Sequence, residues 1–360
     1  MTDTGLPAES QFGGTPRASG PSRGSTETIL TVVAFALAAV VLLLAGWWGW
    51  AAYQAAQTSK LSTPAMRAAE QARAAVAIKP RDASLRVRLA EALATAGSVD
   101  EAMGQLKEAV QIDAKHSGAW LDLGILAMQR GKQQDAAEYF KKVLELTEGT
   151  DMENLNTRRE QAMFYLGQIA VEARQYGDGL RYLKQAILMR RDASDTYLLL
   201  ARAYQGTGST DKALENYKIA VKFDPNYAIA RYELGMLLKK QGDLLNAAKN
   251  LRQSIAAQPG ADPPIEALNA FGPAADYIAK ARTGLAQNKL KTAQGDAEIA
   301  LAIDPQDVTA AMLYGQILEK SGQKAKALEV YRQVLNDHPG DKAAALAVAR
   351  LSAKPGKTGQ

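Results

Sequence analysis

The sequence predicts an all-α protein in which a solenoid of paired helices follows a single transmembrane helix. A pattern of small and large residues recurs every 34 residues over most of the chain. Within each copy, apolar residues recur at helical spacing on both sides of a glycine, which indicates two helices. Ahead of the repeats, residues 29–50 run for 22 positions without a charged side chain.

The composition excludes several kinds of functional site. The chain has 360 residues, no Cys and only two His, His116 and His338, both at repeat boundaries. It therefore cannot form a disulfide, a zinc–thiolate site, a thiol nucleophile or a three-histidine metal site. A net charge of +5 over this length is too dilute to indicate nucleic-acid binding. We expect no enzyme activity, no cofactor or metal, no nucleic acid partner and no small-molecule substrate.

The N-terminal part consists of a polar tail and an apolar segment. Residues 1–28 are rich in Gly, Pro, Ser and Thr and are predicted to be a disordered tail. A helix over residues 29–50 would be roughly 33 Å long, enough to cross a hydrocarbon core of about 30 Å. Aromatic side chains favour the membrane–water interface. The residues predicted to mark that interface are Trp47, Trp48, Trp50 and Tyr53.

The length of the apolar segment favours a retained anchor over a cleaved signal peptide, although small residues at 51–56 could offer a cleavage site. The basic residues nearest the span are almost balanced, with Arg17 and Arg23 before it and Lys60 and Arg67 after it. Because a single N-terminal span usually acts as a signal anchor, we expect the large domain outside the cytoplasm. The predicted location is a bacterial inner membrane.

The repeats begin at residue 83. In one copy, Leu200-Ala201 is followed by Gly208, Ala213 and Tyr217, and the same spacing recurs in the others. The third copy has Arg174 in place of the turn glycine. The seven predicted windows are 83–116, 117–150, 160–193, 194–227, 228–261, 274–307 and 308–341, together residues 83–341.

The segments that flank the repeats have related patterns. Residues 51–82 are predicted to be a connector and a half repeat, with a break near Ser62-Thr63-Pro64. Residues 342–353 are predicted to be a capping helix, and residues 354–360 a tail. The prolines of the insertion at 262–273 could form a hinge within the array.

This pattern resembles the tetratricopeptide repeat family. The resemblance is carried by the aromatic openings Trp120 and Tyr197, the Leu123-Gly124 pair, Tyr204 and the closing Pro225. It covers residues 83–341, about 72% of the chain. It implies a tetratricopeptide α-solenoid, a right-handed superhelix of helix pairs. In this family the first helices line a concave surface, where an extended or helical peptide docks.

The fifth, ninth and twelfth residues of each window are expected to face that groove. The fifth residues are all apolar, while Gln168, Arg202, Gln205 and Lys239 would add hydrogen bonds and positive charge. This suits a peptide with apolar side chains and a carboxylate or acidic residue. The alternative is that these side chains pack inside the superhelix and bind nothing. The predicted peptide-binding residues are Leu121, Ile125, Phe164, Gln168, Leu198, Arg202, Gln205, Tyr232, Met236 and Lys239.

The function predicted from these features is a membrane-anchored scaffold. Its partners would be proteins or peptides, and the bilayer through residues 29–50. It would assemble a membrane or envelope complex by binding peptide segments in its concave groove. A narrower alternative is an assembly factor for a pilus, a secretion system or a cytochrome c maturation machine. An alternative from another class is an enzyme subunit, which the absence of a catalytic residue set disfavours.

Overall fold

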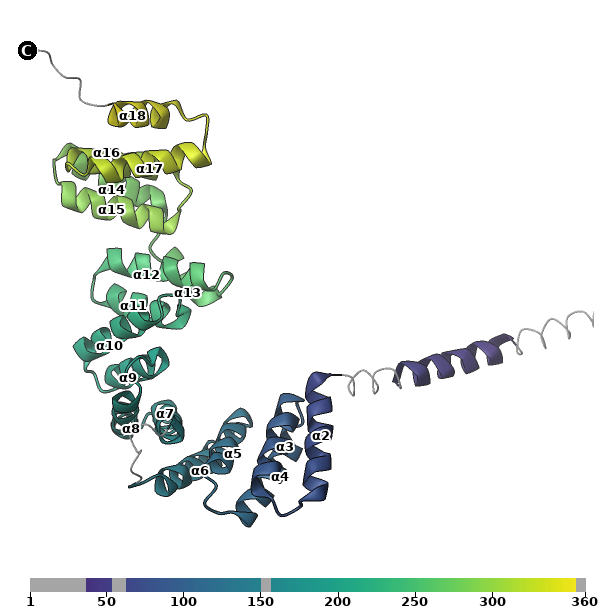
Figure 1. The fold of residues 1–360 in the computed structure, drawn as a ribbon. Helices are drawn as coiled ribbons and strands as arrows, with labels where there is room; N and C mark the ends of the chain where they lie inside the picture. The colour runs from purple at the N-terminus through teal and green to yellow at the C-terminus, as the bar shows by residue number, and fades with distance from the viewer. Residues whose placement is uncertain (1–36, 54–62, 150–156, 354–360) are drawn as a thin grey trace, which may run out of the picture. The chain divides into compact units, whose positions relative to one another are not determined.

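The computed structural model describes residues 37–53, 63–149 and 157–353, and every regular element in these ranges is a helix. The labelled helices are α2 Pro64–Ile78, α3 Ala83–Thr95, α4 Val99–Ile112, α5 Ser117–Gln129, α6 Gln133–Leu146, α7 Thr157–Glu172, α8 Tyr176–Met189, α9 Ser194–Gly206, α10 Thr210–Phe223, α11 Ala228–Lys240, α12 Leu244–Ala257, α13 Asp262–Asn269, α14 Ala274–Ala286, α15 Leu290–Ile303, α16 Val308–Lys320, α17 Lys324–Asp337 and α18 Lys342–Ser352 (Figure 1).

The described residues divide into two compact units, one that ends at Gln105 and one that begins at Leu106. In the first, α2 packs against α3, and Arg73 of α2 bonds Glu101 at 2.6 Å. α2 begins where the sequence predicts a break, because Thr63 caps it by accepting from Met66 N and Pro64 opens it. The division between the units falls within α4, and residues 262–273, where the sequence would allow a hinge, lie inside the second unit.

The second unit is a series of helix pairs, each joined by a short turn. The pairs α5/α6, α7/α8, α9/α10, α11/α12, α14/α15 and α16/α17 pack closely, and each pair contacts the next (Figure 1). α18 lies against α17 and buries Ala344 and Ala347. The all-α repeat architecture predicted from the 34-residue period is therefore confirmed. Each pair falls within its predicted window, except that α7 begins three residues early, at Thr157.

The pairing depends on the small residue that follows a large one in the first helix. A Cβ on Gly124 would overlap the Phe140 ring, which is fully buried. A Cβ on Gly167 would lie 2.5 Å from Leu183 Cγ in the same arrangement. Glycine therefore lets a large side chain of the second helix lie directly on the backbone of the first.

The turns within the pairs need a left-handed residue. Gly208 has φ +76°, and most other pairs also place glycine there. Arg174 and Asn288 occupy the same position in their repeats with φ 59°. The third repeat therefore keeps the same turn although Arg174 replaces the glycine. The left-handed backbone of a non-glycine residue costs strain there.

The insertion at 262–273 is part of the core. It forms α13, which packs on α11 and α12, and its Leu268 is buried beside Leu251 and Tyr277. Phe271, just after α13, packs against the same cluster. These contacts explain why the unit does not divide at the insertion.

The predicted transmembrane segment lies only partly within the described residues. Residues 29–36 are outside them, while residues 37–53 form a helix. Trp47, Trp48, Trp50 and Tyr53 lie on this helix and are each more than half exposed. Within the ranges described, no helix is both long enough and apolar enough to span a membrane.

Candidate functional site

The predicted groove residues differ widely in their exposure. Leu121 and Leu198 are only 5% and 3% exposed, and Leu198 packs among Tyr217 and Leu234. These two side chains stabilise the helix pairs and offer no surface to a partner. Phe164 and Tyr232, at the same repeat position, are half-buried and keep part of the ring accessible.

Several polar residues predicted for the groove are engaged within the chain. Gln168, which is half-buried, donates to Glu172 Oε1 at 2.8 Å. Lys239 donates to the Ala267 carbonyl at 3.2 Å and lies 4.4 Å from the centre of the Phe271 ring. The ammonium group of Lys239 thus contacts the insertion, whereas the sequence predicted that it would contact a ligand.

One pocket brings four of the predicted residues together, Arg202, Gln205, Tyr232 and Met236. It has a volume of about 490 Å³, within the range of about 300–1,000 Å³ that ligand sites have. We call it the Tyr217 pocket. Its lining residues, from α8 to α11, are Tyr176, Arg202, Gln205, Gly206, Tyr217, Tyr232, Glu233 and Met236.

A hydrogen-bonded network holds the polar side of this pocket. Arg202 Nε donates to both carboxylate oxygens of Glu233 at 3.0 Å, and Nη2 donates to Oε1 at 2.5 Å. The Tyr217 hydroxyl lies 2.8 Å from Glu233 Oε2 and 2.9 Å from Gln205 Oε1. Its single proton is best placed on the charged oxygen. Burial, with the charge of Glu233, raises the pKa of Tyr217 far above its usual range, so the phenol remains a donor.

The network changes the chemistry expected of the groove. Arg202 was predicted to meet an acidic ligand, but its charge is already balanced by Glu233. The hydrogen bond with Glu233 raises the pKa of Arg202, so the guanidinium stays charged within the pair. The pocket therefore combines a neutral polar side with the rings of Tyr176 and Tyr232 and the thioether of Met236.

Sequence reasoning missed half of the lining residues. Glu233 directly follows the groove residue Tyr232, and its role depends on reaching α9 of the preceding repeat. Tyr176 packs on Gly206, where any Cβ would overlap its ring. Tyr217, at position 24 of its window, is the one residue whose type could have indicated the pocket. A tyrosine at that position is explained equally well as a core residue.

A second pocket is lined by residues at the same positions of a later repeat. Tyr331 is equivalent to Tyr217, and its hydroxyl donates to Glu319 at 2.7 Å. Arg350 donates to both carboxylate oxygens of Glu319 at 2.6 and 2.7 Å. We call this site, with a volume of about 700 Å³, the Tyr331 pocket. It is lined by Met312, Gln316, Glu319, Lys320, Tyr331, Ala343, Leu346, Ala347 and Arg350.

The remaining candidate, Ile125, is half-buried on α5 and lines neither pocket.

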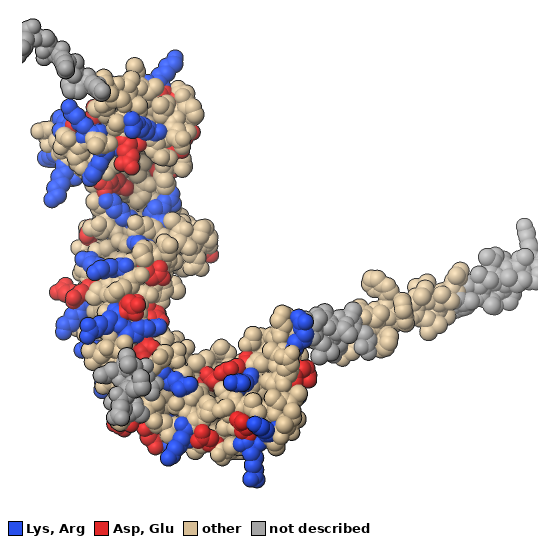
Figure 2. All heavy atoms as spheres, viewed as in Figure 1, with Lys and Arg blue, Asp and Glu red and all other residues tan. Residues whose placement is uncertain are grey.

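The described residues contain no group of three or more His, Asp or Glu side chains that could hold a metal ion. His116 has a structural role, since its Nδ1 accepts from Ala119 N at 3.1 Å and caps α5. On the face drawn in Figure 2, basic and acidic side chains are intermixed along the repeats, without a continuous basic stripe.

Comparison with protein families gives matches to repeat models over several parts of the chain. A model described as TPR repeat matches residues 201–242. Three models described as tetratricopeptide repeat match residues 284–351, residues 65–117, and residues 117–150 with 228–260. No curated protein matches this chain.

Several solved structures are similar to parts of the chain. YrrB, described as a TPR protein with an unusual peptide-binding site, is 21% identical with a TM-score of 0.46, covering 56% of this chain and 98% of its own. MamA from Desulfovibrio magneticus RS-1 is 24% identical with a TM-score of 0.43, covering 50% and 97%. PilF from Pseudomonas aeruginosa is 14% identical with a TM-score of 0.43, covering 74% and 97%.

Proposed function

Because this chain belongs to the tetratricopeptide repeat family, we propose that it is a protein-binding scaffold that captures a segment of a partner in the Tyr217 pocket. The observation that carries this proposal is an accessible apolar surface beside a fixed polar network. Met236 is 40% exposed and lines the same pocket as Tyr232 and the polar network. Covering an exposed apolar side chain in a formed pocket removes apolar surface from water and so stabilises the complex with a partner.

The chemistry of the pocket favours an apolar peptide side chain with polar backbone contacts. Tyr176, Tyr232 and Met236 supply the apolar surface, and the exposed Gln205 has an amide that can pair with a peptide backbone. Since Glu233 already neutralises Arg202, an acidic ligand would have to compete with an existing ion pair. We therefore propose a neutral, apolar segment in place of the acidic one expected from sequence.

We further propose that residues 29–50 anchor this scaffold to a bacterial inner membrane, with the repeats outside the cytoplasm. The uncharged run of 22 residues and the four aromatic residues at its end support this proposal. An anchor would raise the concentration of the repeats near membrane partners, which suits assembly of an envelope complex. Protease protection in spheroplasts tests the orientation. If the protein stays in the membrane fraction after a carbonate wash, the result supports the anchor. Release by carbonate would contradict it.

The peptide-binding proposal is tested by site-specific photocrosslinking in the full chain. A photoreactive phenylalanine analogue at position 236 is compared with the same analogue at position 229. Ile229 is a matched control, because it lies on the same helix and is 47% exposed but lines neither groove pocket. We expect a partner adduct at 236 that is absent at 229, and its loss on adding Tyr232→Ala. Identical adducts at both positions would contradict the proposal.

A further inference from the structure

The fourth residue of several repeats reaches back over the turn that precedes it. The Arg86 Nε donates to the Pro80 carbonyl at 2.9 Å, and the Trp120 Nε1 donates to the Ala114 carbonyl at 2.9 Å. Arg231 Nε makes the same bond to Pro225 at 2.5 Å. In each case the acceptor lies six residues earlier. In these three repeats a long side chain with an N–H donor therefore fills this position and satisfies a turn carbonyl.

The two arginines also bridge to the second helix of their own repeat. Arg86 Nη1 donates to Gln105 Oε1 at 2.8 Å. Arg231 Nη1 bonds Gln253 Oε1 and lies 3.4 Å from Asn250 Oδ1. The guanidinium thus lies between a proline carbonyl and a side-chain amide, using the planar set of donors that arginine offers.

The last repeat has Ala311 at this position, and a cavity of about 250 Å³ lies there. Pro305 lines it at the position of Pro225, and Gln333 at the position of Gln253. Two of the acceptors that meet Arg231, the proline carbonyl and the glutamine amide, are therefore repeated, while Val330 stands in place of Asn250 and the arginine is missing. We call this cavity the Ala311 pocket, and it shares no lining residue with the two groove pockets.

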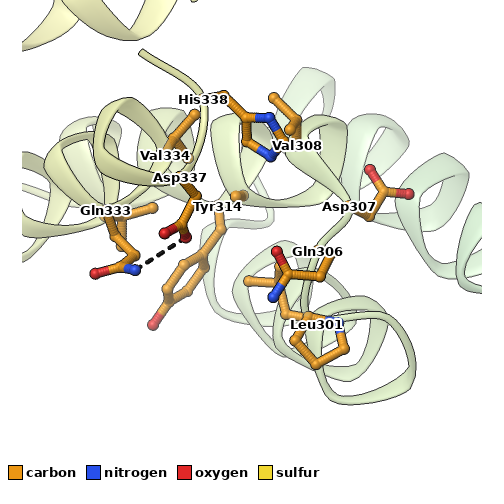
Figure 3. Close-up of a pocket in the computed structure, with 12 residues that line it drawn as sticks. Leu301, Gln306, Asp307, Val308, Tyr314, Gln333, Val334, Asp337 and His338 are labelled. Atoms are coloured by element: carbon orange, nitrogen blue, oxygen red, sulfur yellow. Dashed lines mark hydrogen bonds between the residues drawn. The ribbon is translucent and has the colours of Figure 1, made fainter.

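A carboxylate strengthens this site for a cation. Asp337 replaces Ala257 of the earlier repeat and accepts from Gln333 Nε2 at 2.9 Å, which leaves the amide oxygen of Gln333 as an acceptor (Figure 3). Asp337 is also the last residue of α17, where the helix dipole favours positive charge. The lining residues of this pocket, all within the described ranges, include no Lys or Arg.

We propose that the Ala311 pocket binds an arginine side chain of a partner protein. The guanidinium would take the place that Arg231 occupies in its own repeat, donating to the Pro305 carbonyl, to Gln333 Oε1 and to Asp337. The aliphatic part would pack against Val308, Val330 and the ring of Tyr314. The volume fits one side chain, being below the range of about 300–1,000 Å³ that small-molecule pockets have.

The test measures binding of blocked tripeptides to the full chain by saturation-transfer NMR. The probes are Ac-Ala-Arg-Ala-NH₂ and its analogues with citrulline, lysine or tryptophan in place of arginine. We expect the arginine peptide to bind at least about tenfold more tightly than each of the others, because only it offers both the charge and the planar donors. Equal binding of the citrulline or lysine peptide, tighter binding of the tryptophan peptide, or no detectable arginine binding would overturn the proposal.

Two variants test whether binding occurs at this pocket. Ala311→Arg should fill the site with an internal arginine and abolish peptide binding, and it should raise the melting temperature. Asp337→Asn should weaken arginine binding by about tenfold without a change in melting temperature, so it remains informative if Ala311→Arg folds poorly. Arginine binding that persists in both variants would overturn the assignment. Crosslinking at position 236 should be unaffected by Asp337→Asn, which separates this site from the groove.

Discussion

Arg202 of α9 and Glu233 of α11, 31 residues apart, form an ion pair in which the guanidinium donates to both carboxylate oxygens. The pair connects the first helices of two successive repeats on the surface where a partner is proposed to bind. The Tyr217 hydroxyl, from α10 between them, donates to the same carboxylate. The pair therefore fixes the shape of the groove and also removes its net charge.

Glu233→Gln is expected to lower the free energy of unfolding by about 1–2 kcal/mol, measured by urea denaturation. Loss of one partner from a fully buried pair costs about 3–5 kcal/mol, but here the Arg202 side chain is 38% exposed and water compensates in part. Asp178→Asn is the control, because it breaks a pair with Arg181 that is more than half exposed and should cost less than about 0.5 kcal/mol. Equal effects would show that the network adds no stability.

Gly124→Ala is expected to destabilise the second unit by about 1–3 kcal/mol, because its Cβ would overlap the buried Phe140 ring. Gly104→Ala is the matched control. Gly104 lies inside α4, where a Cβ would meet nothing within 4 Å, so alanine should stabilise that helix by about 0.5–1 kcal/mol. Thermal denaturation followed by circular dichroism measures both changes. Stabilisation by both variants would contradict the close-packing argument.

Arg174→Gly is expected to stabilise the chain by up to about 1 kcal/mol, because it relieves a left-handed backbone at φ 59°. The gain is limited because glycine also increases the entropy of the unfolded chain. Gly208→Arg is the reciprocal control, at the same turn position with φ +76°, and should destabilise by about 1–2 kcal/mol. If urea denaturation gives Arg174→Gly no gain and Gly208→Arg no loss, backbone strain does not explain the preference for glycine.

Glu160→Gln is expected to change the dependence of stability on pH. Burial raises the pKa of Glu160 above its ordinary value of 4.5, although Arg190 Nε at 3.3 Å opposes the shift. The folded protein then holds this proton more tightly than the unfolded chain. Its contribution to stability is present below the ordinary value and is lost as pH rises through the folded pKa.

The melting temperature of Glu160→Gln relative to the parent should therefore rise as pH increases from about 4 to 7. The control is Glu145→Gln, which removes a carboxylate from a side chain that is 66% exposed. Its difference from the parent should vary little with pH. A constant difference for Glu160→Gln across the same range would refute the raised pKa.

The groove shows where prediction from sequence stops. The repeat pattern selected Arg202, Gln205, Tyr232 and Met236, which do lie in one pocket, because position within a helix determines which face a side chain occupies. It could not separate exposed Met236 from buried Leu198, since both are apolar residues at groove positions. Nor could it show that Lys239 contacts the insertion, because that contact depends on how α13 packs.

The helix pairs and the turns within them follow from the sequence alone. These depend on local spacing, on left-handed backbone and on the size of neighbouring residues, all of which recur with the period. The folded chain adds that Arg202 is neutralised by Glu233 and that Ala311 leaves a cavity beside Pro305 and Gln333. Those features depend on which side chains packing brings together. The charge of one side chain and the space left by another are matched by residues that are distant along the chain.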